Sequence, residues 1–585
     1  MKTLRALGTF AHLSLQASGL VALPVGVLAA GVLLAACADE NDPKTWVKRL
    51  DDPAQRAPAI KRLSQFFEDT MTKVNKNREA PEMKQLLDDI VVPMTSQYTA
   101  GNLDDKTRKE LMKALGDMRD PRTAPALAKA LNEYDPGKND EDVKYAAGSI
   151  IGMVALGKTL DPSLVDALWG VFSKFRASQA KSINLLTDLH DAVLAVKSPT
   201  YGPKAVEKLA APVDPKSPES QRDQIQFWQL TSIQVIRDLK FTGGVKPLVK
   251  VLLTPEKKDL WATVESALMH MPKEAEPVLV SVIKGDDPEL AKMSAAFGED
   301  KSHLALAADA LAWLSRTGGR DAVFSAAGGI DSDANRQAFG MSIVKFPVDG
   351  RSIAVFRGLY DGIKGNEDSD ITARAAMLQS SSQFYDPSLT GWLLKEIGGA
   401  KGDSATALQL PALEAAIKLM TTDQQGAVGA VANKLNAQMD KIGSQQEKGT
   451  ASLLKAMYEG SSAMLTQCQQ QVSCYTKQLE EPVATGKEGA NAKAIKSAWM
   501  SVIYAGAAKD QVRGDLVSKL EKVKNPGARL AVVEAIDRLA PTGDPTAAAA
   551  LEKIVEADKS SGDKLLLQAD DSVVKVALRL RARAN

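Results

Sequence analysis

The dipeptide Asp-Pro recurs along this chain between segments whose apolar residues follow helical spacing. An Asp at the N-cap of a helix accepts a backbone hydrogen bond, and Pro fits the first helical position because its missing N–H would have no partner there. Repeated junctions of this kind predict many short helices joined by tight turns. The copies are Asp42-Pro43, Asp52-Pro53, Asp120-Pro121, Asp135-Pro136, Asp161-Pro162, Asp214-Pro215, Asp287-Pro288, Asp386-Pro387 and Asp544-Pro545.

The segment around Asp120-Pro121 shows the pattern in full. Leu111, Leu115 and Met118 recur at helical spacing before it, and a second apolar run follows over residues 126–131. This order predicts a helix, a turn and a second helix. Similar pairs of runs are 143–156 with 164–175, 225–239 with 245–253, 261–269 with 275–283, 304–314 with 321–327, 412–420 with 427–439, and 528–539 with 546–557.

The unit Lys109 to Leu127 resembles a HEAT repeat, because its first helix ends in Leu115-Gly116, an Asp-Pro turn follows, and its second helix opens in small residues. Ala528 to Ala540, with Gly543-Asp544-Pro545, is a second copy. At about 40 to 47 residues per unit, the chain would hold roughly a dozen. The resemblance implies an all-α fold, an α-solenoid of antiparallel helix pairs (HEAT-like superhelix). Tetratricopeptide-like pairing and a compact all-helical enzyme are the alternatives. The Trp, Tyr and Pro pattern of the tetratricopeptide repeat is missing from this sequence.

Composition agrees with packed helices. The chain is 44% hydrophobic but only 5% aromatic, which indicates a core of Ala, Leu, Val and Ile. Lys plus Arg number 73 and Asp plus Glu 72, so no overall field attracts nucleic acid, and we expect no nucleic-acid partner. Short basic runs such as Lys257-Lys258 are interpreted as solvated helix faces.

The N-terminus carries a targeting signal. A basic start precedes an uncharged apolar run over residues 20–36, which ends in Leu34-Ala35-Ala36-Cys37. The quartet resembles a bacterial lipobox, in which Leu34, Ala35 and Ala36 precede the lipidated residue. The resemblance implies that the Cys37 thiol is diacylglycerylated, that cleavage occurs just before it, and that lipid chains hold the protein to a membrane. An uncleaved membrane anchor and a plain secretory peptide are the alternatives.

The residue after the cysteine bears on localisation. In the Gram-negative lipoproteins that this signal resembles, Asp directly after the cysteine favours the inner membrane, whereas here that position is Ala38. We therefore expect a cell-envelope protein anchored to the outer membrane and facing the periplasm. The predicted organisation is a signal peptide (1–36), a lipidated N-terminus and tether (37–45), HEAT-like repeats (46–345), divergent helical repeats (346–480) and C-terminal HEAT-like repeats (481–585).

Residues that could carry catalysis are sparse. His190, His270 and His303 do not have the spacing of a zinc helix, and we find no serine elbow, P-loop or dinucleotide fingerprint. The acidic run Asp140-Glu141-Asp142 fits a helix start, where the dipole favours anions, better than a calcium loop. We expect no catalytic residue, no metal and no cofactor.

Two cysteines remain after Cys37, namely Cys468 and Cys474. In an oxidising periplasm an isolated pair predicts a disulfide. Six residues of straight helix rise about 9 Å, beyond the roughly 7 Å that bridged Cα atoms tolerate, so a bond requires a helix break. Ser473 is the expected cap of a new helix at Cys474. The alternative is two buried thiols on one continuous helix.

Two classes of function follow. A solenoid offers an extended surface, so we expect a scaffold that binds protein partners in the cell envelope. The alternative is an envelope enzyme or small-ligand receptor built from scattered residues. Core packing is the expected role of most tryptophans among Trp46, Trp228, Trp261 and Trp392, and the polar stretches 443–450 and 559–564 predict longer loops.

Overall fold

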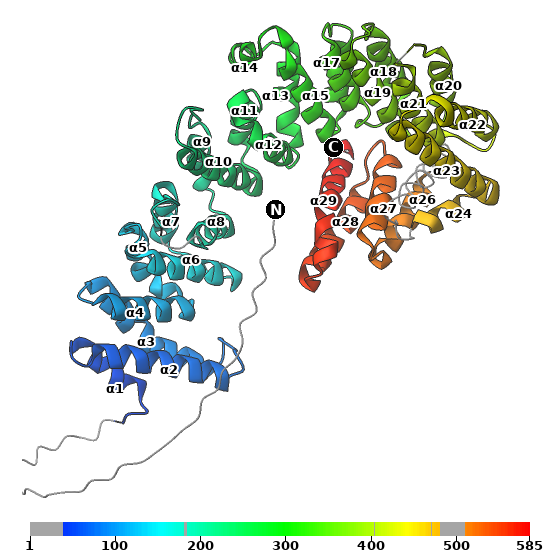
Figure 1. Cartoon of the computed structure of the whole chain (residues 1–585). Helices are drawn as coiled ribbons and strands as arrows, with labels where there is room; N and C mark the ends of the chain where they lie inside the picture. Colours follow the sequence, from blue (N-terminus) through cyan, green and yellow to red (C-terminus); the bar gives the residue numbers. More distant parts are fainter. Residues whose placement is uncertain (1–38, 181–183, 403, 470, 480–508, 585) are drawn as a thin grey trace, which may run out of the picture. The chain divides into compact units, whose positions relative to one another are not determined.

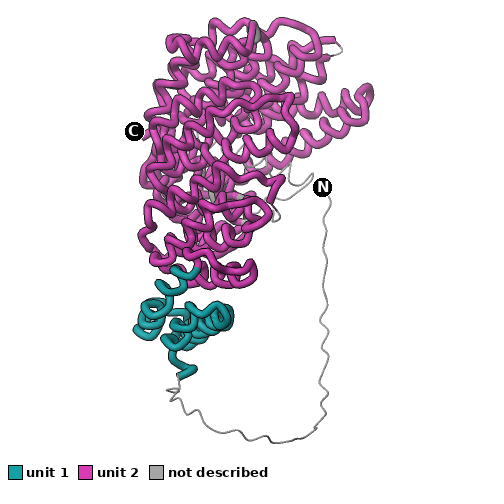
Figure 2. The backbone as a smooth tube through the Cα atoms, turned by 90° about the vertical axis from the view of Figure 1, so that its left-hand side faces the viewer, with its two compact units in different colours: residues 1–97 teal, residues 98–585 magenta. Residues whose placement is uncertain are grey.

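The computed structural model describes residues 39–180, 184–402, 404–469, 471–479 and 509–584, and every regular element in them is a helix. The chain divides into two compact units, residues 1–97 and 98–585 (Figure 2). Among the described residues, no helix combines the length and the apolar character that crossing a bilayer requires.

The first unit is small. It contains α1 (Pro43–Lys48), the 3-10 helix η1 (Arg49–Asp51), α2 (Arg56–Lys73) and most of α3 (Pro81–Ala100). Leu50, Ile60 and Leu63 form its fully buried core. The Gln97 side chain donates a hydrogen bond of 3.0 Å to Asp51, which ties the end of α3 to η1.

The second unit is built on a row of helices that runs through most of its length (Figure 1). Each helix of this first row contacts the next one without interruption. The row consists of α4 (Asp105–Met118), α6 (Asp140–Ala155), α8 (Asn184–Val196), α10 (Glu219–Leu239), α12 (Trp261–Leu268), α15 (Ser302–Leu314), α17 (Asp333–Ile343), α19 (Asp368–Ser380), α21 (Ala405–Leu419) and α23 (Gln445–Cys468).

A second row packs behind the first. It consists of α5 (Ala124–Asn132), α7 (Pro162–Lys174), α9 (Tyr201–Leu209), α11 (Val245–Leu252), α13 (Pro272–Lys284), α16 (Thr317–Ala327), α18 (Gly350–Gly362), α20 (Leu389–Gly399) and α22 (Gln425–Ile442). Shorter elements between the rows' helices include η2 (Pro121–Thr123), η3 (Thr242–Gly244), η4 (Pro255–Leu260), α14 (Pro288–Ser294), η5 (Ala295–Asp300) and η6 (Ser381–Phe384).

The last helices form a separate group. They are α24 (Val472–Leu479), α26 (Lys509–Lys519), η7 (Leu520–Lys522), α27 (Pro526–Arg538), α28 (Pro545–Ser561) and α29 (Lys564–Ala584). α29 packs along both α27 and α28, and it also contacts α15 in the middle of the first row.

Small and aliphatic side chains make the close packing of the rows possible. Leu111 and Leu115 of α4 are fully buried, as are Leu127 and Leu131 of α5. Gly116 brings α4 against α6, because a Cβ added there would lie 3.1 Å from the Tyr145 carbonyl oxygen. The predicted all-α solenoid of helix pairs is confirmed.

The Asp-Pro signals act locally as expected. The Asp side chain caps a helix at Asp42, Asp120, Asp161, Asp287 and Asp544. At Asp52, Asp214 and Asp386 it accepts a hydrogen bond from the amide two residues on, within a turn. The same short side chain therefore serves as a helix cap at some junctions and as a turn former at others.

Three local expectations were wrong. The stretch 443–450 is not a longer loop, because Ser444 and Glu447 form a capping box that starts α23 at Gln445. The stretch 559–564 is mostly helical, since α28 continues to Ser561. The helix after Cys468 begins at Val472 rather than at Cys474, so Ser473 lies in its first turn instead of at the cap.

Asp161→Ala tests the Asp-Pro cap. The Asp161 carboxylate accepts a 2.8 Å hydrogen bond from the Ser163 amide at the start of α7. We expect its loss to speed hydrogen exchange in α7 roughly fivefold, because the first turn of the helix loses its capping bond. Mass spectrometry of α7 peptides measures this rate. Asp223→Ala on α10, an exposed Asp that caps no helix, is the control. Equal rates in both variants would contradict the capping role.

Candidate protein-binding surface

The helices α4, α6, α8 and α10 present an exposed side, which we call the open face. α6 contacts α4 and α8 in its own row and α5 in the second row, so its exposed residues point away from the second row. The exposed residues of the open face are Lys106, Glu110, Lys113, Lys144, Gly148, Ala155, Thr187, Asp191 and Asp238.

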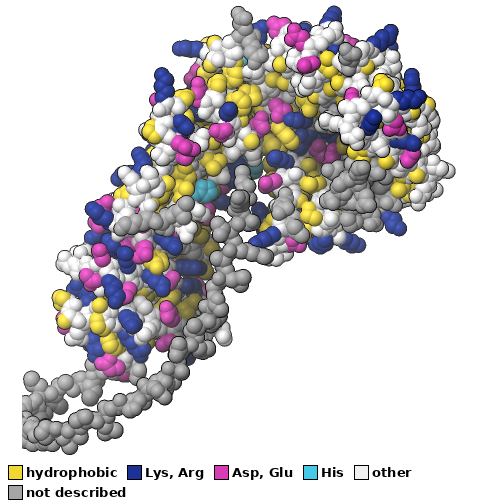
Figure 3. Space-filling model, viewed as in Figure 1, with side chains coloured by type: hydrophobic (Ala, Val, Ile, Leu, Met, Phe, Trp, Pro, Cys, Tyr) yellow, Lys and Arg dark blue, Asp and Glu magenta, His cyan; other side chains and the backbone are white. Residues whose placement is uncertain are grey.

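Charges of both signs are mixed over this surface. Lys109 of α4 lies 3.3 Å from Glu141 of α6, and their side chains are 39% and 57% exposed. Figure 3 likewise shows basic and acidic side chains interspersed on the face that it presents. Such a surface favours a partner with a mixed polar surface over a strongly charged polymer.

His190 joins two helices of the open face. Its Nδ1 lies 2.9 Å from Asp191 and its Nε2 lies 2.7 Å from Gln234 of α10. Both ring nitrogens therefore have partners within the protein, and His190 is positioned as a bridge between α8 and α10. Burial raises the pKa of the nearby Asp188 carboxyl, although Lys144 acts to lower it.

The other predicted polar residues lie apart from one another. His270 makes a 2.9 Å contact with the Ser266 carbonyl oxygen, and the ring of His303 lies 5.7 Å from that of Phe297. Within the described residues, no group of three or more His, Cys, Asp or Glu side chains could hold a metal ion. Asp142 of the acidic run is buried against Arg108, at 3.1 Å, and Tyr98, at 2.8 Å.

The lipobox residues Leu34, Ala35, Ala36 and Cys37 lie outside the described residues. The disulfide between Cys468 and Cys474 is present, with a Cα–Cα distance of 5.5 Å across the gap between α23 and α24. Trp228 and Trp392 are buried, whereas Trp46 and Trp261 are half-buried.

A contact between α29 and the middle of the first row was not expected from the sequence. We call it the C-terminal junction; it joins Trp313, Ser315, Arg316, Val344 and Lys345 to Arg538, Asp537, Arg579, Ala582 and Arg583. In Figure 1 the C-terminal end of the red helix α29 reaches the lower end of the green helix α15, and the two helices are in contact.

Arginine side chains make most of the hydrogen bonds across the junction. Arg583 donates to the Ser315 hydroxyl at 3.2 Å, and Arg316 donates in return to the Ala582 carbonyl oxygen at 3.2 Å. Arg538 donates to the Val344 carbonyl oxygen at 3.0 Å, and Arg579 donates to that of Lys345. The backbone carbonyls of Val344 and Lys345, directly after α17, thus receive guanidinium groups from α27 and α29.

Asp537 organises these arginines. Its carboxylate is buried and lies 3.0 Å from Arg583 and 3.4 Å from Arg579. Burial alone would raise the Asp537 pKa, but Arg579, Arg583 and Arg538 outweigh it and lower the pKa below the ordinary 3.8. Its stabilising contribution is therefore present above pH 3.8 and is lost as the pH falls below that value.

Trp313 lies at the edge of the junction among three cations. Lys345, Lys575 and Arg579 approach its ring centroid to 5.0, 5.4 and 5.6 Å. Contacts of this kind contribute about 0.5–1 kcal/mol each when exposed and more when desolvated. The signal that could have revealed this site is the i, i+4 spacing of Arg579 and Arg583, which places both on one side of the last helix.

Glu265 of α12 is the unusual acid beside this cluster. Burial and the nearby Asp309 carboxylate raise its pKa to about 7, although Lys345 and Lys575 oppose the shift. Asp309 itself is paired with Lys345. Glu265 therefore changes its charge near neutral pH at a position facing the C-terminal helix.

Comparisons with known proteins do not assign the chain to a family. No protein-family model matches it, and no curated protein matches its sequence. A crystal structure of importin beta aligns over 93% of this chain and 79% of its own, with 11% identity and a TM-score of 0.28. A structure from work on a phosphorylation switch controlling the interaction between cadherin and beta-catenin aligns over 91% and 98%, with 13% identity and a TM-score of 0.23.

Asp537→Asn tests the junction. Removing one partner of a buried ion pair costs about 3 kcal/mol or more because the remaining charges stay buried. We expect α29 and the facing α15 to exchange amide hydrogens faster, measured by peptide-level mass spectrometry. Asp571→Asn, an exposed Asp on the same α29, is the matched control. Unchanged exchange in α15 would show that Asp537 does not hold the junction.

Glu265→Gln tests the raised pKa. A folded-state pKa of about 7, above the ordinary 4.5, means that the stabilising contribution of Glu265 is present below pH 4.5 and is lost as the pH rises through 7. We expect the Tm of the variant to exceed that of the wild type increasingly from pH 5 to pH 8.5. Glu274→Gln, an exposed residue of α13, should leave the pH dependence unchanged. Parallel Tm curves for Glu265→Gln and the wild type would disprove the shift.

Proposed function

We propose that this protein is a lipid-anchored, non-catalytic scaffold of the bacterial cell envelope, held to the outer membrane through Cys37 and binding a protein partner on its open face. The observation that carries the proposal is the unbroken first row. A solenoid in which each helix pair contacts its neighbours exposes a long surface suited to another macromolecule.

The anchor rests on the sequence. Leu34-Ala35-Ala36-Cys37 follows an apolar run and a basic start, and α1 begins soon afterwards at Pro43. An extended chain from residue 37 to residue 43 reaches at most roughly 20 Å. A lipidated Cys37 would therefore keep the first unit close to the membrane surface. Stable attachment needs more than one acyl chain, which a triacylated cysteine supplies.

Cys37→Ser tests the anchor. In cells that express the full-length protein, we expect the wild type in the outer-membrane fraction, with a mature N-terminal peptide carrying acyl mass on Cys37. The variant should lose the acyl mass and its processing. Control variant Ala38→Ser keeps the cysteine and should remain lipidated. A wild-type protein whose Cys37 peptide carries no lipid would disprove the lipoprotein proposal.

Site-specific photocrosslinking tests the open face. A photoreactive residue at Lys113 or Lys144 lies on α4 or α6, whereas one at Lys174 lies on α7 in the second row, and all three positions are exposed. We expect discrete adducts with one envelope protein from the first two positions and none from the third. Adducts of equal yield from all three positions, or none from Lys113 and Lys144, would refute binding on the open face.

A further inference from the structure

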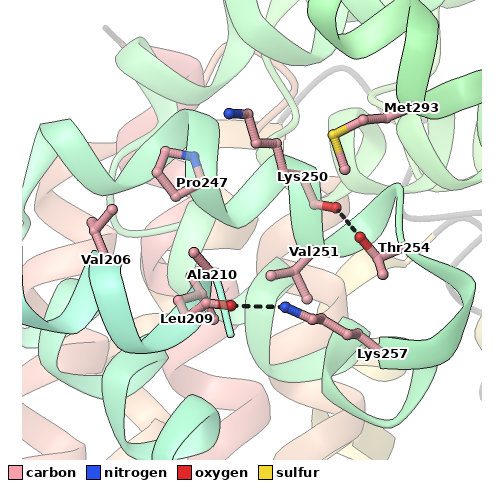
Figure 4. A pocket seen from close by; sticks show the side chains of 9 residues that line it. All are labelled: Val206, Leu209, Ala210, Pro247, Lys250, Val251, Thr254, Lys257 and Met293. Atoms are coloured by element: carbon pink, nitrogen blue, oxygen red, sulfur yellow. Dashed lines mark hydrogen bonds between the residues drawn. The ribbon is translucent and has the colours of Figure 1, made fainter. Parts of the chain in front are cut away.

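A small pocket opens between the second-row helices α9 and α11, with α14 at its edge (Figure 4). Its volume is about 250 Å³. Val206, Leu209, Pro247, Val251 and Met293 give it mainly apolar walls, and the side chain of Lys257 reaches into it. The pocket is distant in the chain from the residues of the C-terminal junction and uses none of the open face.

Lys257 is buried in this apolar setting. Only 7% of the residue is exposed, and its Nζ donates one hydrogen bond of 2.8 Å, to the Leu209 carbonyl oxygen at the end of α9. That bond is the one polar contact of its side chain with the described residues. An ammonium group has three N–H donors, so two remain without an acceptor in the part of the chain that the structure describes.

The interpretation of Lys257-Lys258 as a solvated helix face is therefore wrong for Lys257. Lys258 is exposed, but Lys257 departs from helical geometry within η4, with φ −107° and ψ 18°, and turns inward. Its amide donates to the Thr254 carbonyl oxygen at 2.9 Å, which fixes this turn. The burial of the charge is thus set by the backbone.

Neighbouring lysines differ from Lys257 in having acidic partners. Lys246 lies 2.8 Å from Asp287 and 3.1 Å from Glu289, and Lys250 at the rim of the pocket also pairs with Glu289. These carboxylates are already engaged by other cations. Burial, with no compensating charge, lowers the pKa of Lys257. The pocket therefore combines apolar walls with one uncompensated positive charge.

We propose that this pocket binds a small apolar monocarboxylate, whose carboxylate pairs with the Lys257 ammonium while its hydrocarbon part packs against Val206, Pro247 and Met293. A water molecule takes up about 30 Å³ in the liquid, so the pocket has room for a ligand of roughly eight non-hydrogen atoms. A carboxylate supplies the acceptors that the two free N–H groups need. Benzoate and hexanoate are probes of this size and chemistry.

If Lys257 had only a structural role, a different experimental result would be expected. A cation at the C-terminal end of α9 is favoured by the helix dipole, and the bond to Leu209 could serve that purpose alone. In that case Lys257→Met would lower the Tm but the protein would show no preference for a carboxylate. The two roles are separated by comparing a charged ligand with a neutral ligand of the same shape.

Isothermal titration of the purified full-length protein, against a detergent blank, makes the test. We expect benzoate and hexanoate to bind at pH 7 about tenfold or more tighter than benzamide and hexanamide. Lys257→Met should abolish that preference, and the matched variant Lys258→Met should retain it. Raising the pH into the alkaline range should weaken benzoate binding, because burial lowers the pKa of Lys257 and so favours loss of its proton.

A second variant keeps the proposal testable if Lys257→Met does not fold. Val206→Trp fills the apolar part of the pocket and leaves the Lys257 bond to Leu209 in place. We therefore expect this variant to lose benzoate binding, while the pH dependence of its Tm stays that of the wild type. Equal binding of benzoate and benzamide, absence of benzoate binding at millimolar concentration, or full binding by Val206→Trp would each overturn the proposal.

Discussion

Contact between successive first-row helices is the constraint on which the second unit depends. Each of these helices buries one apolar face against its neighbours in the row and another against the second row. The side chains involved are mostly Ala, Leu, Val and Ile, and Gly116 shows how closely two backbones approach where a side chain is absent. Burial of about 25 cal/mol per Å² of apolar surface, repeated at each interface, stabilises the row without a central core.

The C-terminal junction is held by a different kind of interaction. The row uses apolar contacts between neighbouring helices. The junction uses hydrogen bonds from guanidinium groups to backbone carbonyls more than 190 positions away, and the buried Asp537 pairs with Arg583. Ionic interfaces respond to pH and to the loss of a single partner more sharply than apolar ones. Glu265, which titrates near pH 7 beside α29, adds such a response within the physiological range.

Local sequence signals predicted local structure well. Helical periodicity located the helices around Asp120-Pro121, and Asp-Pro marked caps or turns because both effects depend on residues adjacent in the chain. Pairing was less predictable. The sequence analysis paired 225–239 with 245–253 and 528–539 with 546–557, but α10 packs most extensively with α9, and α28 with α29. Interface area depends on the superhelical path, which periodicity does not encode.

The two sites of greatest functional interest were missed for the same reason. Lys257 and Lys258 are adjacent residues of the same type, so the sequence does not distinguish them. The turn within η4 directs the Lys257 side chain into the protein and leaves Lys258 exposed. Asp537 stands in an ordinary helical run and gains its role from Arg579 and Arg583 on another helix. A charged residue becomes functional or structural through partners that only the folded chain brings to it.

Closure at α15 and α29 changes how the second unit would unfold. In an open repeat array, stability is a sum over nearest neighbours, so a defect in one repeat stays local. Helices α15 to α29 instead form a closed path through the junction, whereas α4 to α12 form an open arm. Damage within the closed path is transmitted to its far end, which makes that segment one cooperative unit. In the open arm each helix pair can open singly, because its stability depends on its nearest neighbours.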